Sequence, residues 1–381
     1  MGQKLKIATL FFAASMAGVA QTPNSSPGSS SRLYRQGNEW VQEISGTLPA
    51  RRVVRVKSSA GSIKVQGGTE TSVSFTVREH IRAATEEAAK KELSRLKFST
   101  YSAGETVLRA ECEGSNHGYI DFDLQIPSQT AAVKLETDGG AVTAKNLSGR
   151  IDVATGGGDI WLDQIGGLVS VASGGGNIEI GKAGNDVSAA TGGGNIHIDS
   201  AAGKVTANSG GGNLRVGEAR VMFLQTGGGW IQVSKCQGQI KAETGGGSIE
   251  LKEILGAAQI ESGGGGIRVG PIRGGVHAET GSGPIVATLA GGKAFTDSRL
   301  ETTVGDITVY VPDGLGVTVR ANVDVARGYG IHSDFPELKI TSSNNVGPRE
   351  AFAEGSINGG GPILHVHTST GNIVFKRKDK Q

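Results

Sequence analysis

Apolar and polar residues alternate in short segments through the middle of the chain, with the two-residue period of a β-strand. Ile196 and Ile198 fall on one face of such a segment and His197 on the other. After a loop, Val205 and Ala207 continue the alternation. The same positions recur in neighbouring units, so each unit is predicted to hold two short strands.

A glycine-rich motif accompanies each pair of strands and returns almost every eighteen residues. It consists of Thr or Ser, a glycine-rich turn, a variable residue and an aliphatic residue, and one step is seventeen residues. Such a fixed short period indicates a stack in which each unit buries its apolar face against its neighbours. The sequence therefore predicts an all-β fold, a single-stranded β-solenoid (β-helix) with 18-residue coils. The motif begins at Thr137, Thr155, Ser173, Thr191, Ser209, Thr226, Thr244, Ser262 and Thr280.

Two columns of positions are expected to face the interior of the stack, with neighbouring strands about 4.8 Å apart. The first column consists of Ile160, Ile178, Ile196, Leu214, Ile231, Ile249, Ile267 and Ile285. The second, at a corner of the coil, consists of Ile165, Ala183, Ala201, Ala219, Cys236, Ile254 and Ile272.

Glycine suits the motif because it adopts positive φ and lets one backbone approach another. A phosphate-binding loop is disfavoured, since no Gly-Lys-Ser/Thr ending and no helix follow the glycines. Calcium-binding repeats would need an Asp in every copy, and only one copy has it. The asparagines are instead predicted to form a hydrogen-bonded ladder between coils. The position after the triplet is occupied by Asp159, Asn177, Asn195, Asn213, Trp230, Ser248, Gly266 and Pro284.

Longer alternating strands and one helix are predicted for residues 41–136, before the regular repeat at 137–291. A degenerate coil is expected at residues 59–65. The helix is predicted over residues 85–97, with Thr85 as N-cap and an apolar stripe of Ala89, Leu93 and Leu96. Because the terminal coil of a solenoid needs a cover, this short helix is expected to cap the open end.

The repeat loosens over residues 292–376, which are predicted to form irregular coils and a cap. Another coil is expected at 303–309 and a strand at 317–321, followed by a long loop at 328–353. Strands at 363–367 and 370–374 are expected to close the C-terminal end, before a basic tail at 377–381.

The N-terminus has the pattern of a secretory signal peptide over residues 1–20. Lys4 and Lys6 precede an apolar stretch at 7–14, and small residues end at Ala20. Residues 21–40 are predicted to be a flexible linker, rich in Ser, Pro and Asn at first. We therefore expect an exported protein that is periplasmic, on the outer surface or secreted.

Composition narrows the possible partners and cofactors. The formal net charge of +2 does not favour nucleic acid, and no later segment approaches a transmembrane span. Low aromatic content, 5%, and 62 glycines suit thin coils. Cys112 and Cys236 are expected to stay unpaired, with Cys236 buried. We expect a monomer without cofactor.

Two pairs of titratable residues fall on alternate strand positions. His365 and His367 would share one strand face, as a metal site requires, but no third ligand is close in sequence. Asp121 and Asp123 likewise share a face. Both pairs are interpreted as exposed strand surfaces, and neither a catalytic nor a metal site is predicted.

An outward column beside the first apolar column holds the candidates for ligand binding. Its side chains vary from coil to coil, so a repeated lattice site is not indicated. The candidates are Trp161, His197, Arg215 and, at a neighbouring position, Trp230. The column consists of Trp161, Glu179, His197, Arg215, Gln232, Glu250, Arg268 and Val286.

The order of these elements over residues 41–376 resembles a bacterial family of β-strand-repeat proteins of unknown function whose members carry the label adhesin. The shared motifs are Gly-Ser-Ile-Lys-Val at 61–65, Leu-Gln-Ile-Pro at 124–127, the serial glycine coils, Ser-Asp-Phe-Pro at 333–336, Ile-Asn-Gly-Gly-Gly at 357–361 and Thr-Gly-Asn-Ile at 370–373. The resemblance implies a β-solenoid on exported or envelope-associated proteins, without established catalytic residues.

We therefore expect a non-enzymatic structural or adhesive protein of the bacterial envelope that binds a surface, glycan or protein partner through its solenoid faces. A carbohydrate-active β-helix enzyme, a lyase or hydrolase, remains an alternative. Such an enzyme would gather carboxylates in one groove, whereas Asp159, Asp163, Glu179, Glu250 and Glu261 are scattered over several columns. An envelope-stress or sensory module is a further alternative.

Overall fold

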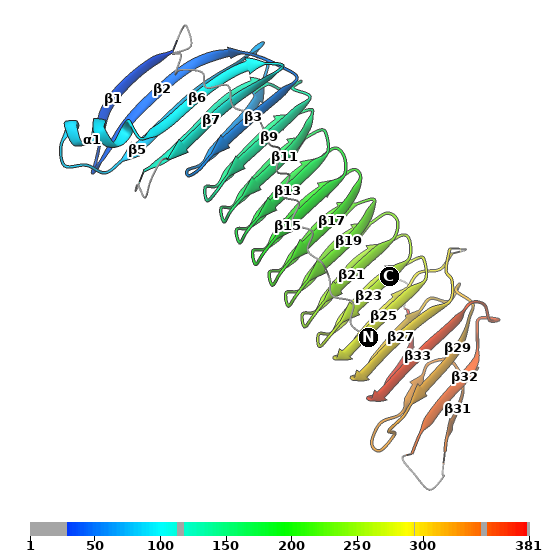
Figure 1. Cartoon of the computed structure of the whole chain (residues 1–381). Coiled ribbons are helices and arrows are strands. Elements are labelled where there is room, and N and C mark those ends of the chain that lie inside the picture. Colours follow the sequence, from blue (N-terminus) through cyan, green and yellow to red (C-terminus); the bar gives the residue numbers. More distant parts are fainter. Residues whose placement is uncertain (1–28, 113–117, 293, 344–348, 379–381) are drawn as a thin grey trace.

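The computed structural model describes residues 29–112, 118–292, 294–343 and 349–378, which form one elongated stack of coils (Figure 1). The predicted signal peptide, most of the basic tail and residues 21–28 of the expected linker lie outside the described residues. The predicted β-solenoid is confirmed. Two long sheets, called sheet A and sheet B below, run the length of the stack.

Each regular coil contributes one strand to each sheet, and successive strands pair in parallel. The strands of sheet A in the regular part are β10 (Val142–Leu147), β12 (Ile160–Ile165), β14 (Ile178–Ala183), β16 (Ile196–Ala201), β18 (Leu214–Ala219), β20 (Ile231–Cys236), β22 (Ile249–Ile254), β24 (Ile267–Ile272), β26 (Ile285–Leu289) and β28 (Ile307–Val311). Those of sheet B are β9 (Ala132–Thr137), β11 (Arg150–Thr155), β13 (Val169–Ser173), β15 (Val187–Thr191), β17 (Lys204–Ser209), β19 (Val221–Thr226), β21 (Ile240–Thr244), β23 (Ala258–Ser262), β25 (Val276–Ser282) and β27 (Ser298–Val304).

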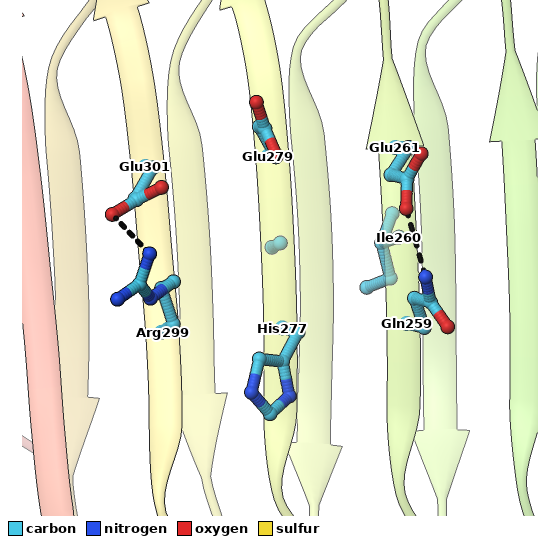
Figure 2. A pocket seen from close by; sticks show the side chains of 8 residues that line it. Gln259, Ile260, Glu261, His277, Glu279, Arg299 and Glu301 are labelled. Carbon is cyan, nitrogen blue, oxygen red and sulfur yellow. Dashed lines mark hydrogen bonds and ion pairs between the residues drawn. The ribbon is translucent and has the colours of Figure 1, made fainter.

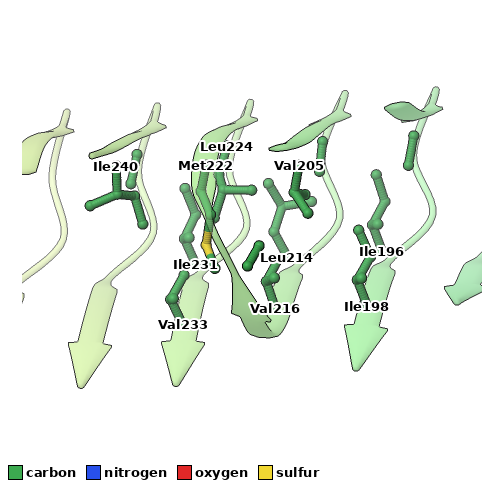
Figure 3. Packing of buried hydrophobic residues seen from close by; sticks show 14 of the residues in the cluster. Ile196, Ile198, Val205, Leu214, Val216, Met222, Leu224, Ile231, Val233 and Ile240 are labelled. Atoms are coloured by element: carbon green, nitrogen blue, oxygen red, sulfur yellow. The ribbon is translucent and has the colours of Figure 1, made fainter. Parts of the chain in front are cut away.

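The interior between the sheets is filled by the two predicted apolar columns, both of which are confirmed. Ile196 of β16 lies opposite Ile178 and Leu214 in the strand register, and all three are buried. Figure 3 shows such side chains pointing between the two sheets. Burying one isoleucine contributes about 1.5–3 kcal/mol, so the column is a main source of stability.

A buried hydroxyl at the start of each motif ties each coil to the one before it. The Oγ1 of Thr191 donates to the carbonyl of Gly176 at 2.8 Å and accepts from the N–H of Gly194 at 3.3 Å. These bonds satisfy backbone groups at a corner where no strand continues. The same pair of bonds is made by Thr155, Ser173, Ser209, Thr226, Thr244 and Ser262.

The glycine triplets are required by close approach between coils and not by positive φ. In the triplet at 174–176, a Cβ on Gly174 would overlap the carbonyl oxygen of Gly156, and one on Gly176 that of Gly158. A Cβ on Gly175 would meet no atom within 4 Å. None of the three has φ in the left-handed region.

The predicted asparagine ladder is confirmed beside the triplets. The side-chain Oδ1 of Asn177 accepts from the N–H of Asn195 at 2.9 Å, and that of Asn195 accepts from the N–H of Asn213 at 2.8 Å. The ladder begins at Asp159 and ends at the N–H of Trp230. Each side chain in the ladder thus bonds to the next coil along the stack, as the backbone strands do.

The N-terminal cap consists of antiparallel strands and α1 (Glu86–Leu93), which is shorter than predicted. Thr85 caps it as expected, and Ala89 and Leu93 are buried. Leu96, assigned to the helix from its spacing, begins β6 (Leu96–Ala103) instead, because this segment gains backbone hydrogen bonds by pairing with β7 (Glu105–Cys112). The other cap strands are β1 (Ser30–Gln36), β2 (Glu39–Pro49), β5 (Ser72–Ile81), β6 (Leu96–Ala103) and β7 (Glu105–Cys112).

Part of the expected linker is in fact ordered sheet. Residues 30–36 and 39–49 form the antiparallel hairpin of β1 and β2, and β2 also pairs with β5. The sequence of β1 shows no clear alternation of apolar and polar residues, because β1 is an edge strand with mostly exposed side chains.

A coil at each end is stacked out of sequence order. At the N-terminus, β3 (Val53–Ser58) and β4 (Ile63–Gly68), the predicted degenerate coil, lie between β7 and β8 (Tyr119–Pro127) on one side and β9 and β10 on the other. At the C-terminus, β33 (Ile363–Thr370) and β34 (Ile373–Arg377) lie between β27 and β28 on one side and β29 (Val317–Val323) and β30 (Ile331–Ser333) on the other.

The last strands of the sequence were expected to close the C-terminal end of the stack. They are not the outermost strands, because the chain turns back and inserts them between earlier ones. The predicted loop at 328–353 contributes strands to the cap: β30, β31 (Lys339–Ser342) and the start of β32 (Ala351–Ile357). In sheet B the order at this end is β27, β33, β29, β32 and β31.

Glu79 and Cys236 are buried ionisable groups whose pKa is shifted by their burial. Glu79 of β5 is 3% exposed, and burial raises the pKa of its carboxyl to about 7. Cys236 is buried and free at the predicted corner, within 3.4 Å of the carbonyl oxygen of Gly238, and burial raises the pKa of its thiol. The side chain of Cys112 lies outside the described residues.

Candidate functional site

The outward column predicted on sheet A is confirmed by the strand register. Trp161 of β12 lies opposite Glu179, Glu179 opposite His197, and His197 opposite Arg215. Three of the four predicted ligand-binding residues therefore belong to one line of side chains. Neighbours in that line are about 4.8 Å apart.

Trp230 does not belong to this line. It occupies the end of the asparagine ladder at the corner between the sheets, four coils beyond Trp161, which corresponds to about 19 Å along the stack. Both rings are partly exposed, Trp161 to 37% and Trp230 to 40%. Because of their separation, they can contact an extended partner together but not a single small molecule.

Electrostatic contacts on the sheet A face are local and exposed. The Nε2 of His197 lies 3.2 Å from the Oδ1 of Asp199, and Gln232 donates to the Oε2 of Glu250 at 2.9 Å. Around Glu250 the face has a shallow hollow of about 300 Å³. It is lined by Ser248, Ile249, Glu250, Gly266, Ile267, Arg268, Pro284 and Val286.

The sheet B face carries two parallel columns of opposite chemistry (Figure 2). The first, called the glutamate column, consists of Glu243, Glu261, Glu279 and Glu301 on successive strands. The second, called the basic column, lies two residues earlier on the same strands and consists of the basic residues Lys241, His277 and Arg299 and the neutral Gln259. An open hollow of about 400 Å³ lies over them.

Most glutamates of this column are paired along their own strand. Gln259 donates to the Oε1 of Glu261 at 2.8 Å, and the Nη1 of Arg299 lies 3.2 Å from the Oε1 of Glu301. Lys241 forms an ion pair with Glu243. His277 and Glu279 carry no such bond to each other in the structure, as Figure 2 shows.

A third cluster of titratable groups lies on the outer side of the N-terminal cap. His80 of β5 stacks on Tyr119 and lies 3.5 Å from carboxylate oxygens of both Glu39 and Asp121. Asp121 also accepts from the N–H and hydroxyl of Ser62 at 2.8 and 2.7 Å. Asp121 and Asp123 lie on the outward face of β8, as expected, and both are half-buried there.

His365 and His367 share one outward face of β33, as predicted. The Nε2 of His367 lies 3.0 Å from the Oδ2 of Asp324. Among the described residues, no group of three or more His, Cys, Asp or Glu side chains is placed to hold a metal ion. No helix in the described parts of the chain is long and apolar enough to cross a membrane.

The sequence reasoning missed the glutamate column and the His80 cluster. The first could have been found by aligning the outward positions of the second strand at the repeat period, where Glu recurs at 243, 261 and 279. The second has no such signal, because Glu39, His80 and Asp121 come from three strands that pair only in the folded cap.

Comparison with known proteins shows structural similarity at low identity. No family model matches the chain, and no curated protein matches its sequence. Three solved structures resemble it: a "putative cell adhesion protein" from Clostridium sporogenes (9% identity, 92% of this chain and 99% of that one, TM-score 0.20), a "putative adhesin" from Bacteroides fragilis (12%, 70% and 96%, 0.27) and a "putative lipid binding protein" from Parabacteroides distasonis (12%, 75% and 98%, 0.32). At these TM-scores the resemblances carry no argument about function.

Proposed function

We propose that the protein is an exported, non-enzymatic adhesive or structural component of the bacterial envelope that binds a surface, glycan or protein partner through the sheet A face. Export is inferred from the signal-peptide pattern of residues 1–20. Binding is inferred from the outward side chains of the folded stack.

The observation that carries the proposal is the line of Trp161, Glu179, His197 and Arg215 on adjacent strands. An aromatic ring, a carboxylate, an imidazole and a guanidinium are held at fixed spacing by backbone ladders. Such a surface is preorganised, so its own ordering costs little affinity when a partner binds. The groups suit a partner that is extended along the stack and contacts several coils at once.

Affinity is expected to be shared among the coils. Each coil offers one or two outward side chains to a partner, and the aromatic and guanidinium groups are the types enriched in binding hot spots. Replacement of His197 by Ala should therefore weaken binding modestly, by about threefold to tenfold. Replacement of Trp161 or Trp230 should weaken it more if a ring or apolar surface stacks there.

The test uses purified protein starting at Gln21, applied to an array of bacterial surface polysaccharides, host glycans and matrix proteins. Variants Trp161→Ala, Arg215→Ala and Trp230→Ala are compared with Tyr329→Ala, a control at an exposed aromatic residue of the C-terminal cap. The proposal expects binding that the control retains and the sheet A variants lose in part. Equal binding by all four variants would refute the placement of the site.

An assay for released saccharides on the same array tests the enzymatic alternative. The proposal expects no turnover. Cleavage of a polysaccharide that is abolished by Asp159→Asn would replace it with a lyase or hydrolase function.

A further inference from the structure

The two columns of the sheet B face have complementary charges, so a second copy of the chain, rotated by a two-fold axis, can place each column over the other. From β9 to β27, each strand presents one outward residue from each of two columns, and the register holds over ten strands. The pairs are Lys134/Glu136, Asp152/Ala154, Ser170/Ala172, Ser188/Ala190, Thr206/Asn208, Phe223/Gln225, Lys241/Glu243, Gln259/Glu261, His277/Glu279 and Arg299/Glu301.

A two-fold axis parallel to the stack, between the two columns, would place the first column of one copy over the second column of another. Lys241 would then lie over Glu243 of the second copy, and Arg299 over Glu301. Like charges would not meet at any of the ten pairs. A two-fold axis along the strands would instead reverse the order of the coils and place Lys134 over Arg299 and Glu136 over Glu301, where like charges repel.

We propose that two copies of the chain associate side by side through their sheet B faces, with the same direction along the stack, so that the basic column of each lies over the glutamate column of the other. Sequence analysis gave no sign of this and favoured a monomer. The symmetry makes the interface self-complementary, as in most homodimers.

The N-terminal half of this face supports close contact by its shape. On β13 and β15 the outward residues are small, namely Ser170, Ala172, Ser188 and Ala190, so two sheets can approach there without long side chains between them. The part of the face with small residues and the part with charged residues thus have different roles. The first allows contact, and the second selects the partner and fixes the register.

The extent of the face is sufficient for a stable dimer. Ten strands at about 4.8 Å spacing give a length of about 43 Å, and a five-residue strand is about 16 Å long. These dimensions correspond to about 700 Å² per copy and about 1,400 Å² in total, within the range of specific interfaces. The sheet A face stays free, so self-association and partner binding can succeed or fail separately.

The test combines sedimentation velocity with a charge exchange. Variant one carries Glu243→Lys and Glu301→Lys, and variant two carries Lys241→Glu and Arg299→Glu. Each should dimerise at least about tenfold more weakly than the wild type, because like charges meet in its own dimer. An equimolar mixture should restore the dimer, since every exchanged contact is again between opposite charges. Restoration also shows that both variants fold.

Salt and cross-linking provide independent measurements. Dimerisation of the wild type should weaken between about 0.1 M and about 1 M salt, where the Debye length falls from about 10 to about 3 Å. A mixture of Ser188→Cys and Ala190→Cys should form an intermolecular disulfide more readily than either variant alone. A wild type that remains monomeric at low salt, or a charge-exchanged mixture that does not associate, would overturn the proposal.

Discussion

The two neighbouring glycines Gly175 and Gly176 should respond in opposite ways to replacement by alanine. At Gly176 the new Cβ would overlap the carbonyl oxygen of Gly158 in the preceding coil. At Gly175 it would meet no atom within 4 Å. The unit that begins at Thr280 already has a serine, Ser282, at the equivalent of Gly175.

The expected magnitude for Gly176→Ala follows from the contacts that must separate. Moving the two coils apart at this corner lengthens the bond from the Oγ of Ser173 to the carbonyl of Gly158 at 2.9 Å and the bond from the N–H of Gly174 to the carbonyl of Thr155 at 3.0 Å. Two lost hydrogen bonds contribute about 0.5–1.5 kcal/mol each and overpacking about 1–3 kcal/mol. The sum is a destabilisation of about 2–6 kcal/mol.

Gly175→Ala should leave stability unchanged or raise it by about 0.4–1 kcal/mol, because alanine restricts the unfolded chain. Stacked repeats can unfold in parts, so urea unfolding should be accompanied by amide hydrogen exchange of β13 and β15. The reasoning predicts faster exchange there in Gly176→Ala alone. Equal destabilisation by both alanines would refute close approach as the reason for the triplets.

Three further substitutions test other parts of the fold. Ile196→Asp buries an unpaired charge and should unfold the neighbouring coils, which circular dichroism on heating would reveal as a lower Tm; an unchanged Tm would contradict its inward position. Asn195→Ala should cost about 0.5–1.5 kcal/mol by removing one ladder acceptor, whereas an isoenergetic result in urea unfolding would leave the ladder without a stabilising role. Because the pKa of Glu79 is raised to about 7, the native state keeps a proton that the unfolded state releases, so stability should fall by about 3 kcal/mol in total as pH rises from about 4.5 to 7. Glu79→Gln should remove this part of the pH dependence, and an identical slope in both proteins would contradict the burial argument.

The regular coils were predictable from the sequence because one rule repeats in them. The period fixes which strands pair, and the alternation fixes which side chains point inward, so the position of Ile196 between Ile178 and Leu214 follows directly. The outward column through Trp161 and His197 follows from the same register. The pattern does not say what that column binds, because its side chains differ from coil to coil.

The ends were less predictable because their partners are distant in sequence. Spacing alone places Leu96 on the helix, whereas the structure uses it in a strand that pairs with β7. The cluster of Glu39, His80 and Asp121 likewise depends on antiparallel pairing of β2, β5 and β8, which no local pattern encodes. Local alternation indicates strands here without indicating their neighbours.

The out-of-order coils at both ends bear on how copies of this protein can meet. A terminal coil in sequence order would expose a long, flat strand edge, which is a template for another chain. Here the inserted coil has a neighbour on each side, and the outer edges are β1 and β6 at the N-terminal end and β30 and β31 at the C-terminal end. Of these, β1 carries Arg32 and Arg35, β6 carries Lys97, and β30 and β31 are short. Charged or short edges disfavour growth of the stack end to end. Association through the long faces is then the route left open, consistent with the complementary columns of sheet B.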